Sequence, residues 1–136
     1  MKPLAAIILS TTLWRWSLGL YGLILAIGTH WPRLRIDGPV ARSDLYIHVA
    51  AFGVLGGVLT LAALWGAPAS RRNLVRALAV GVVFAALDEI TQANPGLGRT
   101  AGFDDFLADV VGLSAGVASA ALLARSVSPR GRTATG

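Results

Sequence analysis

Ionisable residues inside apolar stretches are the part of this sequence that could do chemistry. They fall into three pairs, which are Asp44 with His48, Asp88 with Glu89, and Asp105 with Asp109. Carboxylate oxygens and imidazole nitrogens bind divalent cations, accept hydrogen bonds from a polar ligand, or share protons with one another. If the fold brings the pairs together, they predict either a metal site or a polar binding site.

The surroundings of these residues are typical of a membrane protein. Of the 136 residues, 54% are hydrophobic and only 14% are charged, whereas about 25% of the residues in a soluble domain are charged. A bilayer core about 30 Å thick needs roughly 20 apolar residues per helix. Runs of about that length occupy residues 14–31, 44–65, 73–93 and 104–125. We therefore expect an all-α membrane protein, a bundle of four transmembrane helices.

The segments outside these runs predict no further folded domain. The apolar part of residues 1–13 is too short to span a bilayer and lacks a signal-peptide cleavage pattern, so we expect an interfacial segment or an extended start of the first helix. The four-helix domain then covers residues 14–125, and the polar, basic residues 126–136 predict a disordered tail. The absence of cysteine excludes disulfides and thiolate metal sites. The scattered arginines argue against a nucleic-acid partner.

The distribution of positive charge predicts the orientation. With four spans, the termini and the connection near residues 66–72 share one side, which holds eight of the twelve Lys and Arg residues. By the positive-inside rule, both termini are cytoplasmic and the protein lies in the cell membrane. All seven acidic residues lie in or beside the two opposite connections. The polar chemistry is therefore expected to face outward.

Depth along the helices predicts that the ionisable residues share one level. At 1.5 Å per residue, His48, Asp88, Glu89 and Asp109 lie roughly 8–11 Å outward of the midplane. Charges at that depth tend to face the bundle interior or a water-filled cavity. Below them, the pairs Gly53/Gly57 and Gly112/Gly116 would allow close helix packing. We expect a tightly packed base with a polar mouth.

The connection between the third and fourth runs contributes a cation. It reads QANPGLGRTAGF over residues 92–103, and its proline and glycines predict an irregular, outward-facing turn. Such a turn would bring Arg99 close to the acidic residues. Arg99 would then neutralise Glu89 or Asp105, or bind a phosphate or carboxylate group of a ligand.

Structural roles compete with each of these functional interpretations. His48 could be a hydrogen-bonded packing residue, and Asp44 and Asp104 could be N-caps of the second and fourth helices. The pair Asp88 and Glu89 is harder to explain structurally, because adjacent acids inside a membrane are costly.

Two stretches of the sequence resemble the VanZ-like family. They are LDEITQANPGLGRTAGFDDFLADVVGLSAG and SDLYIHVAAFGVLG, and the resemblance covers roughly residues 12–123. The chain departs from the family pattern at Leu45, where a Lys is common, at Asp109, where an Asn is frequent, and in the two residues inserted before Arg99. The resemblance implies a small membrane protein of a family named for resistance to teicoplanin, and it implies no particular reaction.

Three functions remain open. The first is a binding protein whose outward acidic pocket engages a lipid headgroup, a cell-envelope precursor or a glycopeptide-like molecule and contributes to antibiotic resistance. Its polar contacts would be Glu89, Gln92, Arg99 and Asp105. The second is a metal-assisted membrane enzyme acting on a lipid-linked substrate with a divalent cation as cofactor. Its candidate ligands are His48, Asp88, Glu89 and Asp109. The third is a subunit of a proton-coupled transporter. Binding is favoured over catalysis because the sequence contains no nucleophile motif and no phosphate loop.

Overall fold

All regular structure in the described part of the chain is α-helical. The computed structural model describes residues 2–8, 10–31, 42–94 and 102–128. The helices are α1 (Lys2–Ile8), α2 (Thr11–Thr29), α3 (Ser43–Ala62), α4 (Arg71–Gln92) and α5 (Phe103–Val127). The four long helices begin and end within about three residues of the predicted runs.

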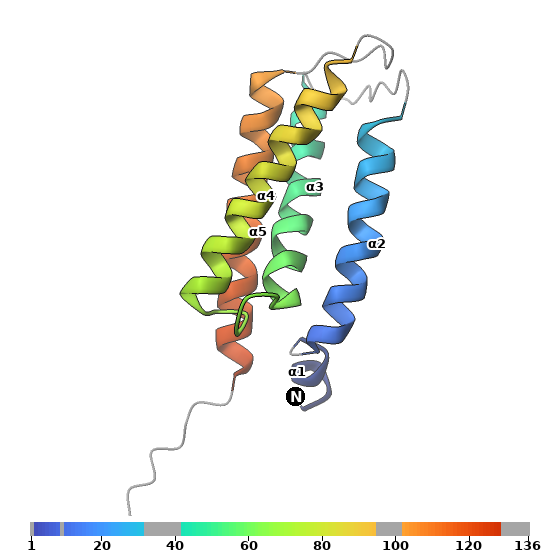
Figure 1. The fold of residues 1–136 in the computed structure, drawn as a ribbon. Helices are drawn as coiled ribbons and strands as arrows, with labels where there is room; N and C mark the ends of the chain where they lie inside the picture. Colours follow the sequence, from blue (N-terminus) through green and yellow to red (C-terminus); the bar gives the residue numbers. More distant parts are fainter. Residues whose placement is uncertain (1, 9, 32–41, 95–101, 129–136) are drawn as a thin grey trace, which may run out of the picture.

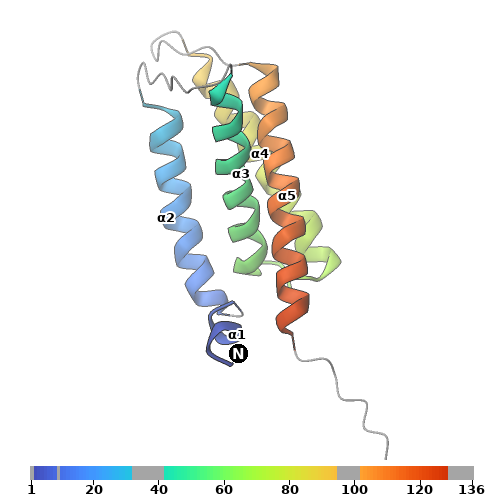
Figure 2. The ribbon, with the colours of Figure 1, turned by 180° about the vertical axis from the view of Figure 1, so that it is seen from behind.

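The four long helices form a bundle in which α2 and α4 run in one direction and α3 and α5 in the other (Figure 1). The start of the chain, the α3–α4 connection and the end of α5 lie at one end of the bundle, as the view from behind also shows (Figure 2). The ends of α2 and α4 and the starts of α3 and α5 meet at the opposite end, which we call the acidic end. Six of the seven acidic residues belong to the described part of this end.

Two of the described helices, α3 and α5, are long and apolar enough to cross a membrane. Side chains on the outside of the bundle are also apolar: Leu20 on α2 is 63% exposed and Leu122 on α5 is 65% exposed. Several polar side chains lie inside instead, among them Asn73, Asp88 and Asp109. Large apolar side chains on the outer surface around buried polar ones are unusual for a soluble bundle.

The pair α3 and α5 packs backbone against backbone. A Cβ atom at Gly56 would lie 2.5 Å from the carbonyl oxygen of Leu113, and one at Gly116 would overlap the carbonyl oxygen of Gly53. The predicted packing through small residues is therefore confirmed. Phe52 and Leu113 are completely buried in the core around this contact. The hydroxyl of Tyr21 on α2 donates to the carbonyl of Ala51 at 2.7 Å and joins α2 to α3.

Polar side chains close the end opposite the acidic residues. The amide of Asn73 is fully buried; it donates to the carbonyl oxygens of Thr60 and Pro68 and accepts from the backbone N–H of Trp65. The guanidinium of Arg15 donates to the last carbonyls of α3, at Ala62 and Ala63. These bonds satisfy backbone groups that the end of a helix leaves unpaired.

Residues 11–13 extend the first predicted helix, whereas residues 2–8 form a separate short helix. Helix α1 ends at Ile8, and α2 begins at Thr11 with Ser10 as its N-cap. The side chain of Ile8 packs with Leu61 and Ala120, while the indole N–H of Trp14 donates to the carbonyl of Ile8 at 3.0 Å. The short helix thereby covers one end of the bundle.

The glycine contact between α3 and α5 predicts a specific sensitivity to added volume. We expect Gly56→Ala to lower the free energy of unfolding by about 1–3 kcal/mol, because the methyl group would push the two backbones apart. Gly22→Ala is the matched control, since its Cβ would have no neighbour within 4 Å among the described residues. It should be neutral or stabilising by up to about 1 kcal/mol. Thermal unfolding in detergent measures both, and equal loss in the two variants would contradict the packing argument.

Candidate functional site

Three ionisable side chains meet at the acidic end, one from each of three helices. They are His48 of α3, Glu89 of α4 and Asp109 of α5, and one ligand atom from each lies within 4.8 Å of the others. The imidazole Nδ1 of His48 hydrogen-bonds Asp109 Oδ1 at 2.8 Å. We call these three residues the His–Glu–Asp cluster. The exposed fractions are 9%, 8% and 0%, so the cluster lies in the bundle interior.

The packing of α3 on α5 explains why His48 faces Asp109. A Cβ at Gly112 would overlap the carbonyl of Val49, so these two positions are in backbone contact. Asp109 lies one turn before Gly112 on the same helix face, and His48 directly precedes Val49. The same contact that brings the backbones together therefore sets the two side chains opposite each other.

The His–Glu–Asp cluster has more hydrogen-bond acceptors than its described neighbours satisfy. Glu89 Oε2 accepts the backbone N–H of Gly102 at 3.2 Å. Three other carboxylate oxygens are buried and accept no hydrogen bond from any described residue: Glu89 Oε1, Asp105 Oδ1 and Asp109 Oδ2. Arg42 Nη2 lies 3.6 Å from Asp105 Oδ1. Buried polar atoms in proteins are nearly always paired, so these oxygens point to a bound proton, ion or ligand.

A cation that the sequence analysis did not single out lies at the mouth of this site. Arg42 Nη2 contacts Asp104 Oδ2 at 2.6 Å, and Arg42 Nε lies 3.6 Å from Asp44 Oδ1. The hydrogen bond with Asp104 and the charge of that carboxylate raise the pKa of the Arg42 guanidinium, which stays positively charged. Arg99, the expected partner of the acids, lies outside the described residues. In the sequence, the position of Arg42 directly before the second predicted helix indicates that it could lie beside the acidic residues at the start of that helix.

Asp88 belongs to a separate network on another face of α4. Its Oδ1 accepts the Thr29 hydroxyl at 2.7 Å, and its Oδ2 accepts the Gln92 amide at 2.6 Å. His30 Nδ1 lies 3.6 Å from Asp88 Oδ1. Adjacent residues on a helix point about 100° apart, so Asp88 faces α2 while Glu89 faces α3 and α5. The predicted single pocket is thus divided in two, with Asp88 and Gln92 on the α2 side.

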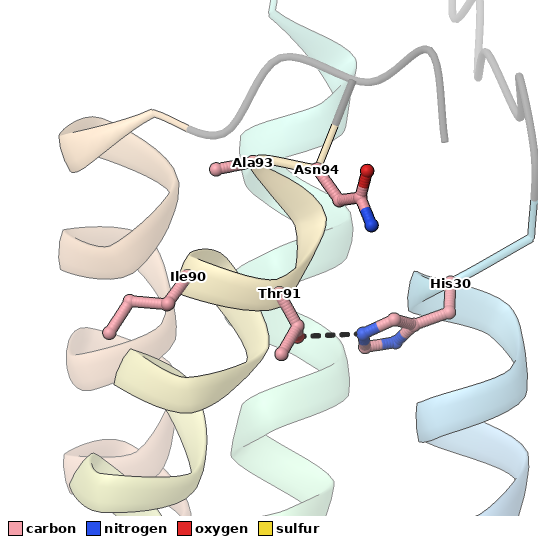
Figure 3. A pocket seen from close by; sticks show the side chains of 5 residues that line it. All are labelled: His30, Ile90, Thr91, Ala93 and Asn94. Atoms are coloured by element: carbon pink, nitrogen blue, oxygen red, sulfur yellow. Dashed lines mark hydrogen bonds between the residues drawn. The ribbon is translucent and has the colours of Figure 1, made fainter. Parts of the chain in front are cut away.

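An open hollow of about 580 Å³ adjoins this second network (Figure 3). It is lined by His30, Ile90, Thr91, Ala93 and Asn94, and His30 Nε2 lies 2.7 Å from the Thr91 hydroxyl. None of the His–Glu–Asp cluster lines it. The site predicted from the sequence did not include Thr29 or His30. A histidine at the end of an apolar run was nevertheless an indication that polar groups gather there.

The capping roles considered for two aspartates are wrong. Arg42 is the N-cap of α3, in a left-handed conformation, and Gly102 is the N-cap of α5. Asp44 and Asp104 lie inside the first turns of these helices, where a negative charge interacts favourably with the helix dipole. Both therefore contribute to the charged mouth around Arg42 rather than to a cap.

No family model, curated protein or solved structure matches the chain.

The network around Asp88 is expected to stabilise the fold. Asp88→Ala would leave the buried Gln92 amide without its acceptor and would remove the Thr29 hydroxyl bond that joins α2 to α4, which should lower the free energy of unfolding by about 1–3 kcal/mol. Asp88→Asn should cost less, because rotation of the Gln92 amide lets the two amides pair. Thermal unfolding of both variants in detergent is the measurement. An alanine variant as stable as the wild type would contradict a structural role.

Proposed function

We propose that the chain is an integral membrane protein of the VanZ-like type in which all four long helices, α2–α5, cross the cell membrane. The exposed apolar side chains support this arrangement, because lipid solvates Leu and Val side chains that would aggregate in water. The charged residues of α4 support it as well. Arg71, Arg72 and Arg76 lie in the first two turns of that helix, and Asp88 and Glu89 lie near its other end.

We further propose that both termini are cytoplasmic and that the acidic end faces outward. The support is the excess of Lys and Arg on the side of the termini. In this orientation, the polar mouth opens towards the cell envelope. Lipid headgroups and envelope precursors are present there at high local concentration.

The function proposed for the acidic end is binding of a polar envelope ligand, such as a lipid headgroup, a cell-envelope precursor or a glycopeptide-like molecule. The buried carboxylate oxygens without a described hydrogen-bond partner carry this proposal. Because they are acceptors, the ligand must supply N–H or O–H donors, as an ammonium or sugar hydroxyl group does. Asp105 is the contact closest to the mouth, with a side chain 13% exposed. A contribution to antibiotic resistance would follow if the bound molecule were the drug or its target.

A membrane enzyme acting on a lipid-linked substrate is the second candidate. The hydrogen bond between His48 and Asp109 favours it, because a buried carboxylate beside an imidazole fixes the ring orientation and stabilises its protonated form. Glu89 lies within reach of the same centre. Loss of a chemical activity in Glu89→Gln, with ligand binding retained, would favour this second function over binding alone.

The proposed topology is testable because the chain contains no cysteine. Ala93 is the C-cap of α4 and Ala67 lies in the α3–α4 connection, so these two exposed residues are at opposite ends of the bundle. In intact cells, a membrane-impermeant maleimide should label Ala93→Cys, whereas Ala67→Cys should react only after the cells are permeabilised. The reverse pattern would overturn the outward-facing site.

Ligand binding is tested by native mass spectrometry of protein released from mild detergent. Wild type is expected to carry a lipid or envelope-precursor mass. Asp105→Asn should reduce its occupancy about 10-fold or more, because a buried hydrogen bond to a charged group contributes about 1.5–3 kcal/mol. Asp104→Asn is the matched control, since its carboxylate is half-exposed and contacts Arg42. Equal occupancy in both variants, or wild type without bound mass, would contradict the proposal.

A further inference from the structure

The geometry points to a divalent metal ion held by His48, Glu89 and Asp109. The inference rests on the proposed function, because it concerns the same acidic end and supplies the ion at which an envelope ligand would bind. The three residues come from three helices and are each at least nine-tenths buried. One ligand atom from each lies within 4.8 Å of the other two.

The spacing of the ligand atoms suits a metal ion. Nitrogen and oxygen ligands lie about 2.0–2.2 Å from Zn²⁺, which places two ligands of one ion roughly 3.0–3.5 Å apart. His48 Nδ1 and Asp109 Oδ1 are 2.8 Å apart, so an ion would take the place of the proton that they share, after a small widening of the pair. The Glu89 ligand atom lies within 4.8 Å of the other two and must move closer by up to about 1–2 Å, which rotation of its side chain permits.

Unused acceptors are the second observation that points to a cation. The His48–Asp109 hydrogen bond and the Gly102 N–H satisfy one oxygen of each acid, and the other oxygen of each remains buried without a described donor. The Arg42 guanidinium contacts Asp104, so it does not neutralise Glu89 or Asp109 directly. Two carboxylates in a low-dielectric interior repel each other strongly, and a divalent cation removes that repulsion.

The ligand types indicate which ion. One imidazole with two carboxylates is suited to Zn²⁺ or Mn²⁺, whereas Ca²⁺ and Mg²⁺ prefer sites made wholly of oxygen. Three protein ligands leave at least one coordination position open, as in zinc sites that bind substrate or water. A hydroxyl oxygen of an envelope ligand, such as a sugar hydroxyl, would bind at that position and could donate its O–H to a neighbouring carboxylate.

Adjacent residues on α4 supply a matched control. Glu89 belongs to the His–Glu–Asp cluster, whereas Asp88 bonds Thr29 and Gln92 on another face of the helix. Glu89→Gln and Asp88→Asn remove the same charge one residue apart. A metal held by the cluster loses one of its three ligands in the first substitution and keeps all three in the second.

The experiment measures metal binding directly in the purified full-length protein. Protein carrying a histidine-free purification tag is stripped with chelator and titrated with Co²⁺ and Zn²⁺, following the visible Co²⁺ spectrum and its displacement by Zn²⁺. Wild type and Asp88→Asn are expected to bind about one ion per chain with similar affinity. Glu89→Gln and Asp109→Asn should bind at least 10- to 100-fold more weakly, the range observed when even an outer-shell partner is lost.

A second readout identifies the nitrogen ligand without relying on the carboxylate variants. Bound Mn²⁺ should show imidazole nitrogen coupling by pulsed electron paramagnetic resonance. The coupling should persist in His30→Gln and disappear in His48→Gln, which together replace the chain's two histidines one at a time.

The results separate the metal site from the proposed ligand. Wild type that binds no stoichiometric ion, or an equal loss of affinity in Asp88→Asn and Glu89→Gln, would overturn the metal site and leave a proton-sharing network. A bound lipid mass in the same wild-type sample would then leave the proposed function standing. One bound ion without any lipid mass would support the metal site and contradict the ligand.

Discussion

The close contact between α3 and α5 is the constraint on which the rest of the structure depends. Glycines at positions 53, 56, 112 and 116 let the two backbones touch, and larger residues at any of the last three would force them apart. The contact sets both the distance and the register of the two helices. It therefore determines that the imidazole on α3 meets the aspartate on α5.

Helix α4 divides the acidic end into two environments with different chemistry. On one face, Asp88 has a described donor for each carboxylate oxygen and joins α4 to α2. On the other face, Glu89 has one oxygen without such a donor and lies beside a buried imidazole and a second carboxylate. The satisfied network stabilises the bundle, whereas the cluster with unpaired acceptors can bind a proton, an ion or a ligand.

At the acidic end, the carboxylates are compensated by a positive side chain near the surface but not in the interior. The exposed guanidinium of Arg42 lies among Asp44, Asp104 and Asp105 and compensates the carboxylates at the mouth. Deeper in the bundle, no described Lys or Arg contacts Glu89 or Asp109. The energetic cost of burying a charge rises from the surface to the interior. An ion, a proton or a donor-bearing ligand therefore stabilises the cluster more than it stabilises the mouth.

Local sequence patterns determined the positions of the four long helices, the small-residue faces and the end of the bundle that holds the acids. These features depend on hydropathy and on the helical period, which can be read along a single chain. The tertiary structure alone decided three features: that Asp88 and Glu89 face different neighbours, that Arg42 pairs with the acids, and that His30 takes part in the second network. They depend on how far each helix is rotated and shifted against its neighbours. That rotation and register result from side-chain packing between segments about 60 or more residues apart, which no local pattern encodes.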